Sequence, residues 1–250
     1  MGTSARPLAV VTGASSGIGY ELARQFASHG HDLTICAEDV GLAEAAHALE
    51  AMGAGVQVVQ ADLATHDGVH TLRDTIEGAG RPVAAIAFNA GVDTSGRFAD
   101  DGPDGTELED ELNLIQLNVV STVHLAEHVL PAMVREGSGR VVFTSSVAGI
   151  MPTPFQAVYG ASKAFVQEFS QSLREELKDT GVTVTALMPG TTDTDFFDRA
   201  GMGDTEEGTE GKKANSAEDV ARMGCEARVL PDSVMAAQVA KKSAPGSAKT

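Results

Sequence analysis

The sequence predicts a doubly wound α/β fold in a single domain, with a parallel sheet of six or seven strands and helices on both faces. Strand and helix signals alternate along most of the 250 residues, and several strand segments are continuous apolar runs, as in sheets buried on both faces. The composition suits such a fold, with 42% hydrophobic residues and 27 glycines for tight turns. Short links between the units imply right-handed crossovers.

The first half of the chain contains four expected strands and three expected helices. Apolar residues at 18, 22, 23, 26 and 27 lie on one helical face, and a glycine ends that helix. The strands are expected at 7–14, 31–37, 55–63 and 82–91, and the helices at 17–30, 41–53 and from the third strand to about Gly78.

The second half supplies two further strands, at 139–146 and 181–190, with a helix over 159–179 between them. Residues 93–113 are acidic and glycine-rich, which indicates a solvated loop leading into a helix. Residues 201–217 have almost no apolar content, so we expect a mobile loop there, within a substrate lid over 193–217.

The C-terminal part leaves the number of strands open. A helix is expected at 216–227, but no β-rich run follows it. Residues 233–242 indicate an amphipathic or frayed helix, and 243–250 a disordered tail. The sheet therefore has six strands, or seven if part of the tail pairs with it.

Charge and composition exclude several classes of partner. The formal net charge of −17 repels nucleic acid phosphates and anionic lipids. No run of about 18 apolar residues exists and the N-terminus does not resemble a signal peptide, so we expect a cytoplasmic protein. Cys36 and Cys225 have no CxxC spacing, which predicts neither a disulfide nor a zinc site, and no residue is predicted as a metal ligand.

A glycine-rich turn follows the first strand. The stretch "VVTGASSGIG" places Gly13, Gly17 and Gly19 between that strand and the first helix. Glycine allows close approach of the backbone to a ligand, and the helix N-terminus offers N–H groups to a pyrophosphate. The spacing differs from G-x-G-x-x-G, but the strand–turn–helix context predicts a dinucleotide site.

Tyr159 and Lys163 form the second chemical signal. They are four residues apart in an expected helix, so their side chains share one face. A free phenol has a pKa near 10, and a nearby ammonium favours the phenolate, as a positively charged nicotinamide would. Tyr159 can then act as general acid or base toward an alcohol or carbonyl oxygen, positioned by the hydroxyl of Ser145 or Ser146.

These motifs resemble the short-chain dehydrogenase/reductase family over roughly residues 6–200. "TGASSGIG" (12–19) is similar to its TGxxxGxG signature, and "FNAG" (88–91) to its NNAG motif with Phe88 in place of the first Asn. Further matching segments follow in the family's order: "ADL" (61–63), "LNVVST" (117–122), "VVFTSSVAG" (141–149), "YGASK" (159–163) and "MPGTTDT" (188–194). The resemblance implies a Rossmann-like fold and an NAD(P)-dependent oxidoreductase that moves hydride between a nicotinamide and a carbonyl or secondary alcohol.

The resemblance also implies site residues. Its catalytic set corresponds to Asn118, Ser146, Tyr159 and Lys163, with Ser146 chosen because the family's serine lies 13 residues before the tyrosine; Ser145 would then point to the other side of the strand. Lys163 would hold the nicotinamide ribose, and Asn118 would anchor a proton-relaying water. We interpret Thr12 and Asn89 mainly as braces of the sheet and turn. The implied cofactor-binding residues are Gly13, Ser15, Ser16, Gly17, Ile18, Gly19, Glu38, Asp62, Leu63, Asn89, Ala90, Gly91, Tyr159, Lys163, Pro189, Gly190 and Thr194.

The end of the second strand bears on the choice between NAD and NADP. The family's NAD enzymes usually carry Asp where this chain has Ala37, and its NADP enzymes often carry Arg where this chain has Glu38. Neither pattern is met, and Ser16 supplies no cation. Because Glu38 and Asp39 are carboxylates that repel a 2′-phosphate, we favour NAD.

The expected substrate is a hydrophobic ketone or secondary alcohol, because apolar residues follow several motifs. They are Ile150, Met151, Phe155, Met188, Phe196 and Phe197. Helices over 108–136 and 155–179 imply a homodimer or homotetramer, by resemblance. Two alternatives are an epimerase or lyase, and a catalytically impaired nicotinamide-binding sensor or scaffold, which the incomplete C-terminal region favours.

Overall fold

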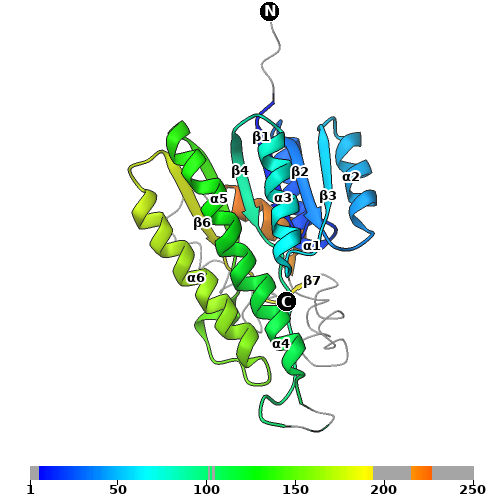
Figure 1. Cartoon of the computed structure of the whole chain (residues 1–250), viewed down its shortest axis with the longest axis vertical. Coiled ribbons are helices and arrows are strands. Elements are labelled where there is room, and N and C mark those ends of the chain that lie inside the picture. The colour runs from blue at the N-terminus through cyan, green and yellow to red at the C-terminus, as the bar shows by residue number, and fades with distance from the viewer. Residues whose placement is uncertain (1–5, 101, 103–104, 194–214, 227–250) are drawn as a thin grey trace, which may run out of the picture.

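The structure is a computed structural model that describes residues 6–100, 102, 105–193 and 215–226. Its centre is a six-stranded sheet in the order β3-β2-β1-β4-β5-β6 (Figure 1). Every neighbouring pair is parallel. The strands are β1 (Leu8–Thr12), β2 (Asp32–Ala37), β3 (Val56–Gln60), β4 (Val83–Phe88), β5 (Gly139–Thr144) and β6 (Val182–Leu187).

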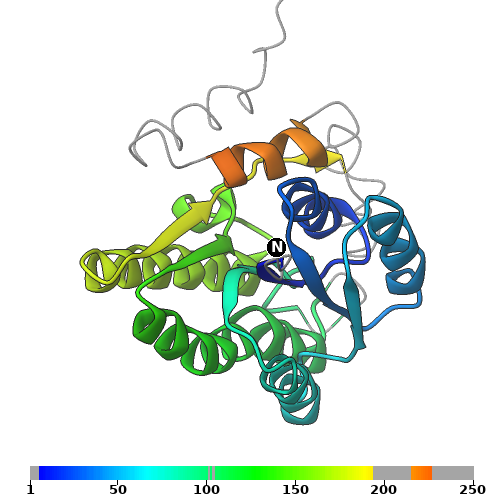
Figure 2. The ribbon, with the colours of Figure 1, turned by 90° about the horizontal axis from the view of Figure 1, so that it is seen from above.

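Helices cover both faces of this sheet, so the predicted doubly wound α/β fold is confirmed (Figure 2). One face carries α1 (Gly17–Ser28), α2 (Leu42–Ala51) and α9 (Ala217–Glu226), whose apolar residues form one core cluster with the strands. The other face carries α3 (His66–Gly78), α5 (Ser121–Glu136) and α6 (Ala157–Leu177), which form a second. The chain returns to the centre after β3, which opens a crevice at the carboxyl ends of β1 and β4.

Continuous burial holds for the central strands but not for β3. All five residues of β1 are buried, whereas β3 exposes Gln57, Val58 and Gln60. The reason is position: β3 is an edge strand with β2 as its only neighbour in the sheet. Cys36 in β2, by contrast with β3, is fully buried, and this burial raises the pKa of its thiol to about 12.

Shorter elements connect the sheet to the site. The acidic loop after β4 leads into α4 (Leu108–Ile115), and α4 continues through a π-helical turn, η1 (Gln116–Val120), into α5. A 3₁₀ turn, η2 (Val147–Ile150), follows β5. A two-stranded sheet joins β7 (Thr192–Asp193) to β8 (Asn215–Ser216), so both ends of the predicted lid are described.

The interior of that lid, residues 194–214, lies outside the described residues, as do the predicted helix at 233–242 and the tail at 243–250. Among the described residues, the main sheet has six strands. None of the helices described is both long and apolar enough to cross a bilayer.

Candidate active site

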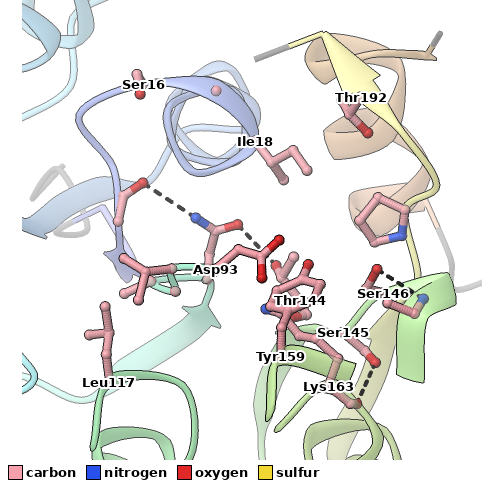
Figure 3. A pocket seen from close by; sticks show the side chains of 18 of the residues that line it. Ser16, Ile18, Asp93, Leu117, Thr144, Ser145, Ser146, Tyr159, Lys163 and Thr192 are labelled. Carbon is pink, nitrogen blue, oxygen red and sulfur yellow. Dashed lines mark hydrogen bonds between the residues drawn. The ribbon is translucent and has the colours of Figure 1, made fainter. Parts of the chain in front are cut away.

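A cleft of about 290 Å³ opens along the carboxyl edge of the sheet. Its lining comes from the glycine turn, from the segments after β2, β3, β4, β5 and β6, and from the start of α6 (Figure 3). Parallel strands bring all these segments to one edge, although they are spread over nearly 180 residues of sequence. The cleft thus unites the two signals found in the sequence, the glycine turn and the Tyr159–Lys163 pair.

The glycine turn has the conformation that its sequence requires. Gly13 and Gly17 have φ angles of 66° and 55°, in the left-handed region that other residues avoid. A Cβ on Gly19 would lie 2.0 Å from the carbonyl oxygen of Gly13, so this position accepts only glycine. Gly19 is buried beneath the turn and does not itself line the cleft.

The N-terminus of α1 is suited to an anion. Ser16 occupies the N-cap position without a side-chain capping hydrogen bond, and the first turn contains no acidic residue. The backbone N–H groups of this turn and the helix dipole therefore point toward the cleft without an internal counter-charge. The pyrophosphate of a dinucleotide fits this environment.

Hydrogen bonds tie the turn to the neighbouring strands. The Thr12 hydroxyl accepts from the backbone N–H groups of Asn89 and Ala90, at 2.9 and 3.0 Å. The Asn89 amide donates to the Gly13 carbonyl at 3.3 Å and accepts from the Thr144 hydroxyl at 3.0 Å. The structure thus agrees with the interpretation of Thr12 and Asn89 as braces, and it adds Thr144 to them.

Phe88, the one residue of "FNAG" that differs from the NNAG motif, is explained by packing. Its ring stacks on Phe143 of the adjacent strand β5, with 4.7 Å between centroids and 10° between planes. Both rings belong to the core beneath α5 and α6. An apolar side chain is therefore accommodated at this position without disturbing the following Asn89.

Tyr159, Lys163 and Ser146 meet at one end of the cleft. Tyr159 and Lys163 are 8% and 5% exposed, and the ammonium lies 5.7 Å from the centroid of the phenol ring. Lys163 Nζ donates to the Thr144 carbonyl at 3.1 Å. Ser146 Oγ accepts from the Ala148 N–H at 3.1 Å, and its side chain also forms a hydrogen bond with Tyr159.

Ser145 is oriented differently from Ser146. Its hydroxyl donates to the backbone carbonyl of Lys163 at 3.0 Å, which attaches β5 to α6. This contact engages the hydroxyl in holding the helix, whereas Ser146 lies beside the phenol. The alternation of side chains along the strand end thus separates the two serines, as the sequence suggested.

Burial opposes the phenolate that the nearby Lys163 ammonium is expected to favour. Burial raises the pKa of Tyr159 well above that of a free phenol, and the carboxylate of Asp93 raises it further, while the hydrogen bond from Ser146 lowers it. Burial also lowers the pKa of Lys163 to about 8, partly opposed by Asp93. Loss of hydration therefore favours the protonated phenol at Tyr159.

Asn118 supports this end of the cleft from beneath. It lies in η1 and is 2% exposed. Its amide donates to the Val92 carbonyl and accepts from the Val92 N–H, both at 2.9 Å, and also donates to Ser162 at 3.1 Å. These bonds attach the segment after β4 to α6, and the Asn118 side chain does not line the cleft.

Asp93 is the principal residue that the sequence analysis missed. It is 8% exposed, lines the cleft and accepts a hydrogen bond from the Gln156 side chain. Its carboxylate influences the pKa of both Tyr159 and Lys163. Its position two residues after the "FNAG" motif could have indicated a place near the cofactor site. The sequence alone did not show that the loop brings Asp93 into the same cleft as Tyr159.

The opposite end of the cleft is acidic. Glu38, Asp39 and Asp62 line it, following β2 and β3. The Asp39 carboxylate accepts from the Ser15 hydroxyl at 2.6 Å and the Gly41 N–H at 2.9 Å, and Asp62 accepts from the Ala64 N–H at 2.8 Å. Glu38 is exposed.

Most of the predicted cofactor residues do line the cleft. They are Gly13, Ser15, Ser16, Gly17, Ile18, Glu38, Asp62, Leu63, Asn89, Ala90, Gly91, Tyr159, Lys163, Pro189 and Gly190. Gly19 does not line the cleft, and neither does Asn118 of the predicted catalytic set. Thr194 lies outside the described residues. Thr192, which was not predicted, lines the cleft and donates to the Gly190 carbonyl at 2.9 Å.

The predicted apolar lining is placed only in part. Met151 lines the cleft, whereas Met188 is buried in the core and Ile150 is exposed. The ring of Phe155 lies beneath the Arg97 guanidinium, at 5.6 Å, away from the cleft lining. Phe196 and Phe197 lie outside the described residues.

The chain is similar to known proteins over this same region. A family model described as short chain dehydrogenase matches residues 7–203. Among curated proteins, Sulfoacetaldehyde reductase 2 of Chromohalobacter salexigens is 36% identical over 191 residues, which cover 76% of this chain and 74% of the relative.

Solved structures with bound nicotinamide cofactors are also similar. A short-chain dehydrogenase from Sphingobium yanoikuyae in complex with NADPH has a TM-score of 0.77 and 30% identity, with 98% of each chain covered. A short-chain dehydrogenase/reductase from Burkholderia phymatum in complex with NAD has a TM-score of 0.79 and 26% identity, covering 91% of this chain and 87% of the other.

Gly19→Ala is expected to abolish measurable NADH and NADPH binding. The added methyl group would overlap the Gly13 carbonyl and displace the turn that offers its N–H groups to the pyrophosphate. Binding is measured by nicotinamide fluorescence, against a background that contains no tryptophan. Gly78→Ala is the matched control, because a Cβ there meets nothing within 4 Å. Wild-type binding by Gly19→Ala would contradict this role of the turn.

The ionisation of Tyr159 can be observed directly in a Tyr20→Phe variant, which leaves one tyrosine. Ultraviolet titration of the ligand-free protein should show a phenol pKa above that of free tyrosine. Asp93→Asn removes a negative charge and should lower this pKa, whereas Ser146→Ala removes a hydrogen bond and should raise it. Circular dichroism at each pH checks that the protein stays folded. A Tyr159 pKa below that of free tyrosine in the Tyr20→Phe protein would show that attraction to the Lys163 ammonium outweighs the effect of burial.

Proposed function

The chain belongs to the short-chain dehydrogenase/reductase family and is an NAD(P)-dependent oxidoreductase; we propose that it reduces a carbonyl group to an alcohol with Tyr159 as the general acid. The observation that carries this proposal is the buried phenol of Tyr159, bonded to Ser146 and next to Lys163, in the same cleft as the glycine turn. A protonated phenol is the form that donates a proton to a carbonyl oxygen.

Each residue has a distinct task in this reaction. The bound nicotinamide supplies the hydride in reduction and accepts it in oxidation. Tyr159 donates its proton to the substrate oxygen, and the Ser146 hydroxyl, already bonded to the phenol, orients that oxygen. Lys163 is still largely a cation at pH 7, because its pKa is about 8, and so stabilises the phenolate that remains. Asn118 holds the Val92 segment and α6 in register.

The raised pKa of Tyr159 favours reduction over oxidation at neutral pH. Oxidation of an alcohol needs the phenolate as base, which the ligand-free site disfavours. A positively charged nicotinamide nearby lowers the cost of forming it. The named relative is a reductase, which supports this direction, and the comparisons do not favour an inactive sensor or scaffold.

We further propose that NAD is preferred over NADP. The support is electrostatic: Glu38 and Asp39 line the end of the cleft that follows β2, where the adenosine ribose is expected. A carboxylate accepts a hydrogen bond from the 2′-hydroxyl of NAD and repels the 2′-phosphate of NADP. Similar structures contain either cofactor, so the preference depends on these side chains in this chain.

The proposed substrate is an uncharged, largely apolar ketone or aldehyde. Met151 and Leu117 offer apolar surface in the cleft, and the buried carboxylate of Asp93 beside Tyr159 disfavours anions. This chain would thus differ from its relative named for sulfoacetaldehyde, which is an anion. Faster turnover of sulfoacetaldehyde than of neutral carbonyl compounds would contradict the proposal.

A homodimer or homotetramer is also proposed. Exposed apolar side chains gather on the helical segment α4–α5 and on α6, namely Leu112, Ile115, Val120, Val134 and Phe165. Exposed apolar side chains on paired helices are often covered in subunit interfaces. Sedimentation of the purified protein as a monomer at micromolar concentration would refute this assembly.

Tyr159→Phe should reduce the rate of carbonyl reduction by about 100-fold or more, the usual contribution of general acid catalysis. NADH binding should be retained, because the ring still fills the same volume. The rate is measured as NADH consumption with a panel of neutral ketones and aldehydes. Tyr20→Phe, which changes the tyrosine outside the cleft, serves as the control. Equal rates for the two variants would exclude Tyr159 as the acid.

NADH should bind more tightly than NADPH, and Glu38→Arg should shift the ratio of the two dissociation constants toward NADPH by about tenfold, or about 1.4 kcal/mol. Glu44→Arg is the matched control, since it makes the same charge change at an exposed position of α2 outside the cleft. Both are measured by fluorescence titration at one salt concentration. A wild-type preference for NADPH would contradict the electrostatic argument.

A further inference from the structure

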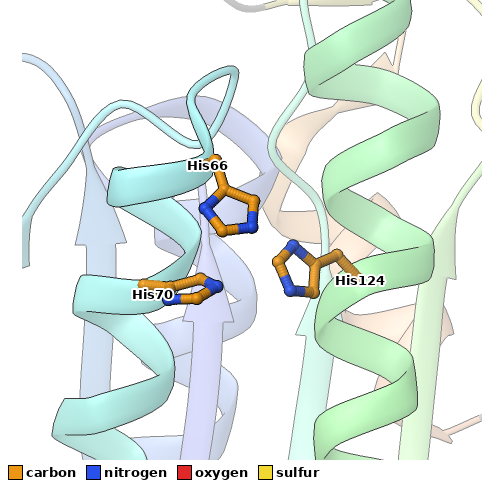
Figure 4. A group of neighbouring side chains, drawn as sticks. All are labelled: His66, His70 and His124. Carbon is orange, nitrogen blue, oxygen red and sulfur yellow. The ribbon is translucent and has the colours of Figure 1, made fainter.

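Three histidines converge between α3 and α5, and none of them lines the cleft (Figure 4). His66 and His70 are one turn apart on α3, and His124 faces them from α5. One ring nitrogen of each lies within 4.8 Å of the others. The ring centroids of His66 and His70 are 4.0 Å apart, and each lies 5.3 Å from that of His124.

The helices that carry these rings are fixed in position. Val69 and Leu72 of α3 and Leu125 of α5 are buried in the same core cluster. The histidines therefore project from two elements that are held together by packing, rather than from a loop. A ligand shared by the three rings would find them already close to one another.

The ring nitrogens are available to a ligand. Within the described part of the chain, no hydrogen bond to a ring nitrogen of His66, His70 or His124 is present, although His29 and His31 make such bonds. The one cation close enough to affect them, Arg73, is paired with Asp74 at 2.6 Å.

We propose that His66, His70 and His124 bind a divalent transition metal ion of the Zn²⁺ class, with water in the remaining position. Imidazole is a preferred ligand for Zn²⁺, Ni²⁺ and Cu²⁺. Nitrogen ligands about 2.1 Å from a tetrahedral ion are about 3.4 Å apart, so the present arrangement needs only side-chain rotations to close around it. His66 is exposed and free to rotate.

The bound ion would connect α3 to α5 and thereby stabilise the folded chain. Neither helix alone supplies the site, since the two rings on α3 and the ring on α5 come together only in the native state. His128 lies one turn after His124, with ring centroids 5.2 Å apart, and marks the outer edge of the cluster. The site is independent of the proposed reaction, because none of these residues lines the cleft.

The two i, i+4 pairs were visible in the sequence as H-x3-H spacings at 66–70 and 124–128. Each pair alone is compatible with an ordinary helix surface, so neither spacing by itself indicates a metal site. Only the packing of α3 against α5 brings them within reach of one ion.

The test uses the untagged full chain, freed of metal by chelation, in calorimetric titration with ZnCl₂ at neutral pH. Wild-type protein should bind one equivalent of Zn²⁺ and show a higher melting temperature with the ion. His70→Ala and His124→Ala should each weaken binding by about tenfold or more, as the loss of one ligand does. His47→Ala is the matched control, because His47 is an exposed histidine on α2 outside the cluster.

Circular dichroism and NADH binding check that each variant is folded, and the exposed His66→Ala provides a third variant with little risk to the core. Absence of saturable Zn²⁺ binding by the wild type would overturn the proposal. So would wild-type affinity in the cluster variants, which would place the ion elsewhere, for example at a cysteine. In either case the three histidines would pack against one another without sharing a metal ion.

Discussion

The hydrogen bonds of Thr12, Asn89 and Thr144 hold the carboxyl ends of β1, β4 and β5 together, and the site depends on this alignment. Asn89 connects the glycine turn to Thr144, whose carbonyl in turn accepts the Lys163 ammonium. A continuous set of polar contacts therefore runs from the glycine turn at one end of the cleft to Lys163 at the other. Buried polar groups must be paired, so these contacts allow one relative placement of the turn and α6.

Burial determines the protonation that Tyr159 and Lys163 favour. The spacing of Tyr159 and Lys163 suggested a phenolate stabilised by an ammonium, but both side chains are almost completely withdrawn from water. Each group then favours its neutral form, so the phenol keeps its proton and the pKa of the lysine falls to about 8. The carboxylate of Asp93 raises both pKa values, so it favours the protonated phenol and also the protonated lysine. A protonated phenol next to a lysine that is still largely a cation at pH 7 suits the proposed reduction of a carbonyl.

Prediction from sequence succeeded where a local pattern has a local cause. The alternation of strands and helices, the Gly13–Gly19 turn and the pairing of Tyr159 with Lys163 depend on residues that are close in the chain. It failed where distant segments meet. Asp93 reaches the phenol through a loop whose path no local pattern records, and β3 is exposed because of its place at the edge of the sheet. The presence of an aromatic side chain at Phe88 is explained by its stacking on Phe143, which lies 55 residues later in the chain.

The sequence by itself determined the order and kind of the elements, the family resemblance, and the residue types able to move a proton beside a hydride-carrying cofactor. Hydrophobic periodicity and the placement of glycines involve residues that are close in the sequence, so they can be recognised without coordinates. Only the tertiary structure decided the protonation of Tyr159, the positioning role of Asn118 and the meeting of His66, His70 and His124. Hydration and pairwise distance are properties of the packed molecule, because they depend on which distant residues surround a group.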